Sequence, residues 1–139
     1  MRFAELARAR STCLRRAVGA VIVVDRNVVA TGYNGAPKGL PHCAEVGCLR
    51  AKLKVPSGER HELCRGLHAE QNAIIQAAYH GTSIRGGTLY CTTSPCSICA
   101  KMIINAGIRR VVFSEEYKDP LAGQLMEGSG IEIVQISAG

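Results

Sequence analysis

Residues 68–114 read HAEQNAIIQAAYHGTSIRGGTLYCTTSPCSICAKMIINAGIRRVVFS, and helical and extended patterns alternate along this segment. The spacing predicts a helix over His68–Tyr79, a strand over Thr88–Thr92, a helix from Pro95 to about Ala106 and a strand over Arg109–Ser114. A glycine follows each helix where it is expected to end, and the proline is expected at the first helical position. Such an alternation indicates a layered α/β sheet with parallel crossover connections.

The flanking sequence extends this pattern in both directions. We expect an amphipathic helix over residues 2–14, then strands over Val18–Val24 and Val28–Tyr33 that form a hairpin. After the central segment, residues 119–128 have a helical pattern and Ile131–Ile136 has the pattern of a closing strand. The sequence shows no internal repeat or composition shift that would indicate a second domain.

The bulk composition is that of one compact domain over residues 1–139. Hydrophobic residues make up 47%, which is too many for a disordered chain, and no apolar run is long enough to span a membrane. Aromatic residues make up only 4%, which argues against a surface that stacks single-stranded nucleic acid. The net charge of +6 favours an anionic partner, either a nucleic acid or a phosphorylated small molecule.

The seven cysteines are an odd number, and we expect no secretory signal peptide before them. A disulfide framework is therefore a poor explanation, and metal ligands are a better one. The cytoplasm is the expected compartment.

Cys96 and Cys99 form the first chemical motif, within the sequence Pro-Cys-Ser-Ile-Cys. Residues three apart on a helix share a face, and the start of a helix favours thiolate over thiol. The pair is therefore suited to one zinc ion, although a redox pair or two buried core cysteines have the same spacing.

His68 and Glu70 form the second motif, and they are too close in sequence to share a helix face. By itself this motif is a capped helix start with a surface glutamate. Combined with the two cysteines, His68 completes three protein ligands and leaves a fourth position open, which is typical of catalytic zinc. Glu70 is then placed to carry protons. The combination H-x-E…P-C-x-x-C is the signature of zinc deaminases.

At these residues the chain resembles the cytidine deaminase superfamily. The segments Ser11–Cys13, Gly32–Pro37 and His68–Ala73 resemble its deoxycytidylate (dCMP) deaminase branch, which includes bacterial and phage enzymes and a late-competence deaminase-like protein. The resemblance implies a three-layer α/β/α fold whose five-stranded mixed sheet has helices on both faces. It also implies zinc-dependent hydrolysis of dCMP to dUMP and ammonia, with Glu70 moving protons.

The resemblance further implies substrate contacts. It assigns roles to four residues: Asn34 contacts the sugar, the Ala69 amide contacts the base carbonyl, the Ser94 carbonyl contacts the leaving amine, and Tyr117 closes the pocket. For Tyr117, simple packing at the end of a strand is an equally good explanation. For the phosphate we select Lys38, which follows the Gly-Tyr-Asn-Gly turn, although a solvated loop charge explains it equally well.

Residues 35–66 are rich in proline and glycine, and so long an irregular segment needs an explanation. Members of the branch carry a second, structural zinc. The resemblance implies as its ligands Cys13, Cys43, His61 and Cys64, with His42 and Cys48 as alternates. Buried free thiols are the other explanation, and this is the one we prefer for Cys91 in its predicted strand.

Other functions remain open at this point. A tRNA adenosine deaminase shares both motifs but is expected to lack the Gly-Tyr-Asn-Gly turn and the cysteine-bearing segment, and a non-catalytic zinc-stabilised binding module has no use for Glu70. The resemblance also implies a homo-oligomer, often a hexamer, and regulation by dCTP and dTTP, with Mg²⁺ accompanying a nucleotide effector.

Overall fold

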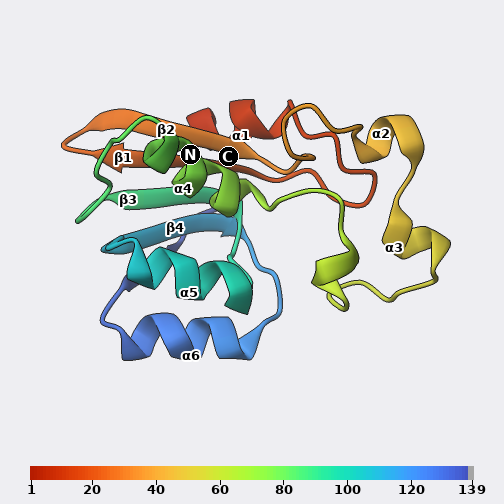
Figure 1. Cartoon of the computed structure of the whole chain (residues 1–139). Coiled ribbons are helices and arrows are strands. Elements are labelled where there is room, and N and C mark those ends of the chain that lie inside the picture. The colour runs from red at the N-terminus through yellow and green to blue at the C-terminus, as the bar shows by residue number, and fades with distance from the viewer. Residues whose placement is uncertain (138–139) are drawn as a thin grey trace.

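The computed structural model describes residues 1–137, so the last two residues of the predicted domain lie outside the described part. Its centre is a five-stranded sheet in the order β2-β1-β3-β4-β5 (Figure 1). The strands are β1 (Gly19–Val24), β2 (Asn27–Tyr33), β3 (Thr88–Thr93), β4 (Arg110–Glu115) and β5 (Glu132–Gln135). Strand β1 is antiparallel to both neighbours and the other pairs are parallel, which confirms the predicted mixed sheet.

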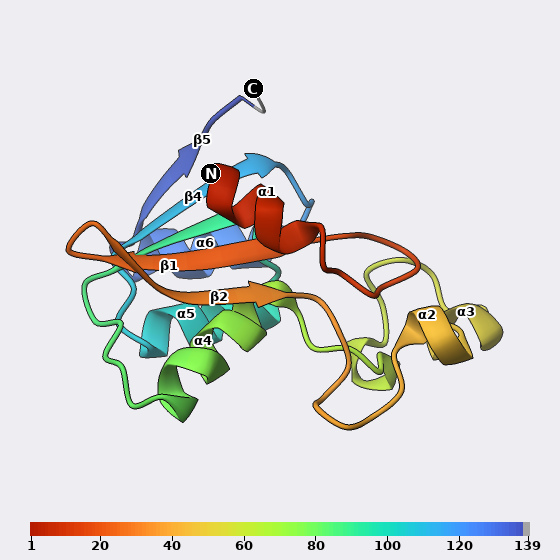
Figure 2. The same ribbon diagram turned by 90° about the horizontal axis from the view of Figure 1, so that it is seen from above.

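Helices cover both faces of this sheet, as the resemblance implied (Figures 1 and 2). They are α1 (Arg2–Arg8), α2 (Cys43–Val46), α3 (Leu49–Lys52), α4 (Ala69–Tyr79), α5 (Ser97–Asn105) and α6 (Pro120–Gly128), with a 3₁₀ turn, η1 (His61–Leu63). Helix α1 lies on one face, and α4, α5 and α6 lie on the other.

Two glycines let these helices approach the sheet closely from opposite sides. A Cβ atom on Gly19 would lie 2.0 Å from the Ala4 carbonyl oxygen of α1, and one on Gly32 would lie 2.2 Å from the Ala69 carbonyl oxygen of α4. Gly32 pairs with Ala20 across the hairpin, so the two glycines face opposite layers. The backbone of α4, which carries both residues of the second motif, is thus held directly against β2.

The main core lies between the sheet and the three-helix layer. Ile22, Leu89 and Val111 are cross-strand neighbours in β1, β3 and β4, and all three are fully buried together with Ile103 of α5. Burying each such side chain contributes roughly 1.5–3 kcal/mol to folding. This row anchors the strands from which the site residues follow.

The first helix differs from the prediction for residues 2–14. It ends at Arg8, and the side chain buried against the sheet is that of Ala4, whereas Phe3, Leu6 and Leu14 are exposed. Ala4 faces the sheet because the close approach at Gly19 leaves no room for large side chains between α1 and β1.

The start of α5 also differs from the prediction. Cys96, and not Pro95, precedes the helix as its N-cap residue, and the helix begins at Ser97. The Ser97 amide donates a 2.8 Å hydrogen bond to the Asp119 carboxylate, which also caps α6, so an acceptor distant in sequence fixes where α5 begins.

Residues 35–66 contain only short helices and project beside the end of the sheet (Figures 1 and 2). A bridge between Gly35 and Leu67 closes this segment at its base. We call residues 35–66 the cysteine segment, because Cys43, Cys48 and Cys64 lie in it. No helix among residues 1–137 has the length and apolar character needed to cross a membrane.

Candidate active site and metal centre

The first three site residues meet where two helices begin. Strands β2 and β3 run parallel, so the helices that follow them, α4 and α5, begin at the same edge of the sheet. His68 is the N-cap residue of α4, Cys96 is the N-cap residue of α5, and Cys99 follows in the first turn of α5. Their ligand atoms all lie within 4.8 Å of one another, and within residues 1–137 no other group of three or more metal-ligating side chains is this close.

The distances within this triad fit a metal ion. His68 Nδ1 lies 3.2 Å from Cys99 Sγ and 3.5 Å from Cys96 Sγ. Tetrahedral zinc, with bonds of about 2.0 Å to nitrogen and about 2.3 Å to sulfur, holds such atoms about 3.5 Å apart. A nitrogen and two sulfurs are also the donor types that zinc prefers. The residues therefore fit zinc and leave its fourth position free of protein.

The electrostatics of the triad favour an anionic sulfur. A hydrogen bond from the Cys99 thiol, together with one from His68, lowers the pKa of Cys96 to about 4. The same sulfur–sulfur hydrogen bond raises the pKa of Cys99, which donates it. One sulfur is thus a thiolate at neutral pH, and thiolate is the form that binds zinc.

Glu70 lies beside the triad and is not one of its ligands. Its side chain is buried on α4, with only 5% of the residue exposed, and burial raises the pKa of its carboxyl group. Glu70 is therefore not the exposed glutamate at a helix start that the second motif alone would indicate. A carboxyl whose pKa is moved toward neutrality is suited to exchanging protons.

A cavity opens from the triad, and four predicted substrate contacts line it: Asn34, Ala69, Ser94 and Tyr117. Asn34 accepts hydrogen bonds from Ser11 Oγ and the Val18 amide and donates to the Arg16 carbonyl, so its orientation is fixed. The Tyr117 amide donates to Ser94 Oγ at 2.7 Å, which holds Tyr117 at the wall.

The structure does not bring Lys38 into this cavity. Its ammonium group lies over the Tyr79 ring, 4.5 Å from the centroid, and Lys38 is not among the residues that line the cavity. Four arginines line the cavity instead, and sequence analysis did not select them: Arg15, Arg16, Arg50 and Arg65.

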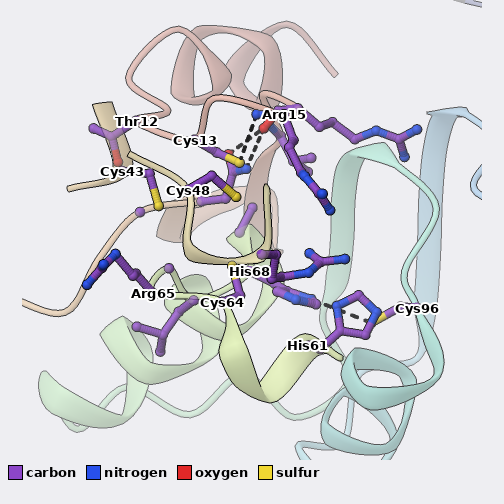
Figure 3. A pocket seen from close by; sticks show the side chains of 18 of the residues that line it. Thr12, Cys13, Arg15, Cys43, Cys48, His61, Cys64, Arg65, His68 and Cys96 are labelled. Carbon is purple, nitrogen blue, oxygen red and sulfur yellow. Dashed lines mark hydrogen bonds between the residues drawn. The ribbon is translucent and has the colours of Figure 1, made fainter. Parts of the chain in front are cut away.

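The four cysteines predicted as ligands or alternates of a second zinc, here called the cysteine cluster, gather on another wall of the same cavity: Cys13, Cys43, Cys48 and Cys64 (Figure 3). Burial and the other three sulfurs raise the pKa of Cys43, whereas Arg65 lowers it. Backbone amides donate to Cys13 Sγ and to Cys48 Sγ, each at 3.4 Å. Cys48, predicted only as an alternate, thus joins the group.

The two other predicted ligands of a second metal lie elsewhere. His61 packs edge-on against His68, with 5.2 Å between ring centroids, so it forms a wall of the first site (Figure 3). Nδ1 of His42 lies 2.9 Å from Thr12 Oγ1 and accepts a hydrogen bond from the Ala36 amide, so this atom is already engaged.

Comparison with known proteins agrees with this geometry. The family model "Cytidine and deoxycytidylate deaminase zinc-binding region" matches residues 1–115. The chain is 38% identical to deoxycytidylate deaminase of Schizosaccharomyces pombe over 97% of its length and 42% of the relative. It is 42% identical to ComE operon protein 2 of Bacillus subtilis over 91% of its length and 64% of the relative. It is 34% identical to deoxycytidylate deaminase of phage T4 over 98% of its length and 87% of the relative.

Among solved structures, dCMP deaminase of cyanophage S-TIM5 in complex with dCMP and dUMP superposes with a TM-score of 0.79, at 33% identity, covering 97% of this chain and 92% of that one. The chain spans only 42% and 64% of the first two curated relatives it matches. The match over residues 1–115 shows that this chain belongs to the cytidine and deoxycytidylate deaminase family.

Proposed function

We propose that this protein hydrolyses dCMP to dUMP and ammonia at the cavity beside His68, Cys96 and Cys99. The observation that carries the proposal is the meeting of three zinc-ligating atoms within 4.8 Å of one another next to a buried carboxyl group. Its substrate is supported by relatives of 34–40% identity that are named deoxycytidylate deaminase, and by the neighbour solved with dCMP and dUMP. The tRNA adenosine deaminase alternative is not favoured.

Zinc held by the triad would supply a water whose pKa is lowered from 15.7 toward about 7. Glu70 accepts a proton from this water and passes it to N3 of the base as the water oxygen bonds to C4. It then takes the remaining proton of the new C4 hydroxyl group and delivers it to the amine, whose bond to C4 breaks so that ammonia leaves and the C4 carbonyl forms. Its buried position keeps its pKa raised, so it holds a proton more readily than an exposed glutamate. The Ala69 amide donates to the base carbonyl, and the Ser94 carbonyl accepts from the amine.

The substrate is tested by offering purified protein dCMP, dCTP, deoxycytidine and a tRNA stem-loop while ammonia release is measured. Release from dCMP, with a matching loss of cytosine absorbance, supports the proposal. Activity confined to the RNA would overturn it.

We also propose that the cysteine cluster binds a second, structural zinc. Four sulfurs would form a closed ligand set on a zinc ion that drew them together, since no three of them lie within 4.8 Å of one another in this structure. The cysteine segment has few elements of its own to stabilise it, and a bound metal would do so. The neighbouring cation Arg65 offsets the negative charge of the thiolates. His61 is left out of this ligand set, because it packs against His68. Cys48→Ser is expected to reduce the zinc content by one ion per chain, and unchanged content would exclude the site.

Several properties stay predictions: regulation by dCTP and dTTP, Mg²⁺ with a nucleotide effector, a homo-oligomer such as a hexamer, and the cytoplasm as compartment. All seven cysteines are free, which fits a reducing compartment.

A further inference from the structure

Arg50 is a buried cation that the chemistry described so far does not use. It belongs to α3, lines the cavity and is only 8% exposed. Its Nε atom is buried and has no hydrogen-bond partner among the described residues, and one terminal nitrogen makes a long, 3.5 Å hydrogen bond to the Pro56 carbonyl. Most of its donors are therefore unused by the protein.

Arg50 also lacks a counter-charge. The ion pairs within residues 1–137 are Arg8–Glu115, Arg60–Glu62 and Arg110–Glu132, and none of them involves Arg50. Burying an unpaired charge costs several kcal/mol, so buried arginines are normally matched by an anion. The unmatched guanidinium therefore points to an anionic ligand in the cavity.

The cysteine cluster does not explain Arg50. Among the described residues Arg50 makes no hydrogen bond to any of the four sulfurs, and its hydrogen bond goes to the Pro56 carbonyl. Its side chain lines the same cavity as His68 and Cys96 of the zinc triad. A ligand that reaches the triad would therefore pass within the field of Arg50.

The other two arginines of the cavity are engaged elsewhere. Arg15 donates to the Val55 carbonyl at 2.7 Å, and Arg16 lies over the Tyr117 ring, 5.3 Å from its centroid. Both are exposed, so neither needs a ligand to offset burial. Arg65 also has a buried Nε without a hydrogen-bond partner in the described chain, but Arg65 is only partly buried. Arg50 is the more buried of the two and has no anionic partner among the described residues.

We propose that Arg50 binds the 5′-phosphate of the nucleotide and thereby makes the site select dCMP over deoxycytidine. This inference rests on the proposed function. A guanidinium presents a planar fork of donors that matches phosphate oxygens in a bidentate geometry. Cys48, the N-cap residue of α3, lies two residues before Arg50, so the cysteine cluster holds the helix that presents this phosphate-binding residue.

The test compares wild type, Arg50→Met, Arg50→Lys and the control Lys38→Met, whose cation lies outside the cavity. For Arg50→Met we expect kcat/KM for dCMP to fall by about 10- to 150-fold, the loss of one charged hydrogen-bonded contact, with no change for deoxycytidine. For Arg50→Lys, which keeps the positive charge but not the planar fork of donors, we expect a smaller fall in kcat/KM for dCMP. Lys38→Met is expected to match wild type.

Calorimetric titration with dUMP and deoxyuridine provides a measurement independent of turnover. We expect wild type to bind dUMP more tightly than deoxyuridine, Arg50→Met to lose that difference and Arg50→Lys to keep only part of it. If Arg50→Met does not fold, a reduced difference in Arg50→Lys decides. Equal losses for dCMP and deoxycytidine would overturn the inference, as would equal affinity of wild type for dUMP and deoxyuridine. If wild type deaminates neither substrate, the proposed function fails, and the dUMP comparison alone decides the role of Arg50.

Discussion

Gly32 lies in β2, against the backbone of α4, and substituting it by alanine is expected to displace α4 and thereby the zinc triad. The new Cβ would lie 2.2 Å from the Ala69 carbonyl oxygen and 2.5 Å from the Ala73 amide nitrogen. Ordinary contact begins at 3.4 Å, so α4 must retreat by 3.4 − 2.2 = 1.2 Å or the strand must bend. Both obstacles are backbone atoms, and neither can rotate away. Overpacking of this kind costs typically 1–3 kcal/mol, and we expect the upper end, about 3 kcal/mol.

The same displacement carries His68 and Glu70 with it, because they are the N-cap residue and the second residue of α4. A misplacement of about 1 Å in a catalytic constellation lowers turnover by about 100-fold. We therefore expect Gly32→Ala to reduce kcat for dCMP by that order and to weaken zinc binding.

The matched control is Gly123→Ala, in the interior of α6, where a Cβ meets nothing within 4 Å. Alanine is favoured over glycine in a helix by about 0.8–1.0 kcal/mol, so this variant is expected to gain stability. Urea unfolding followed by circular dichroism, at a fixed free-zinc concentration because bound metal adds to apparent stability, measures both changes. Equal midpoints for the two variants would refute the close-packing argument.

Three further changes probe the site and its supports. Glu70→Gln is expected to keep zinc and to lose about 10²- to 10⁴-fold in kcat, because it removes the proton carrier and no ligand; exposed Glu127→Gln is the control, and loss of metal would contradict the role. Cys96→Ala is expected to lose the catalytic zinc, which metal analysis measures, and a fully metallated, active variant would exclude Cys96 as a ligand. Asp119→Ala is expected to lower the free energy of unfolding by about 0.5–2 kcal/mol, because Asp119 caps α6 and accepts from the Ser97 amide; an unchanged denaturation midpoint would show that the cap is dispensable.

The sheet and the zinc triad could be predicted because local patterns determine them. Strands such as Thr88–Thr93 carry β-branched or apolar runs between turns, and the H-x-E and C-x-x-C spacings each place their residues at the start of one helix. The errors at the ends of elements arose from distant contacts. The start of α5 is set by Asp119, and the residue that α1 buries is set by its close contact with Gly19, so neither follows from the residues of the helix itself.

The cysteine segment was the least predictable part, because no periodic pattern orders it. His61 and Cys64 are neighbours in sequence and were predicted to bind the same ion, yet the turn η1 separates them, so that His61 contacts His68 and Cys64 joins the cysteine cluster. One available signal was the close spacing of Cys48 and Arg50. Cys48 is the N-cap residue of α3 and Arg50 is its second residue, so a metal bound at Cys48 would hold the short helix that presents Arg50. Loss of metal from the cysteine cluster is therefore expected to weaken the binding of the phosphate while the zinc triad is still intact.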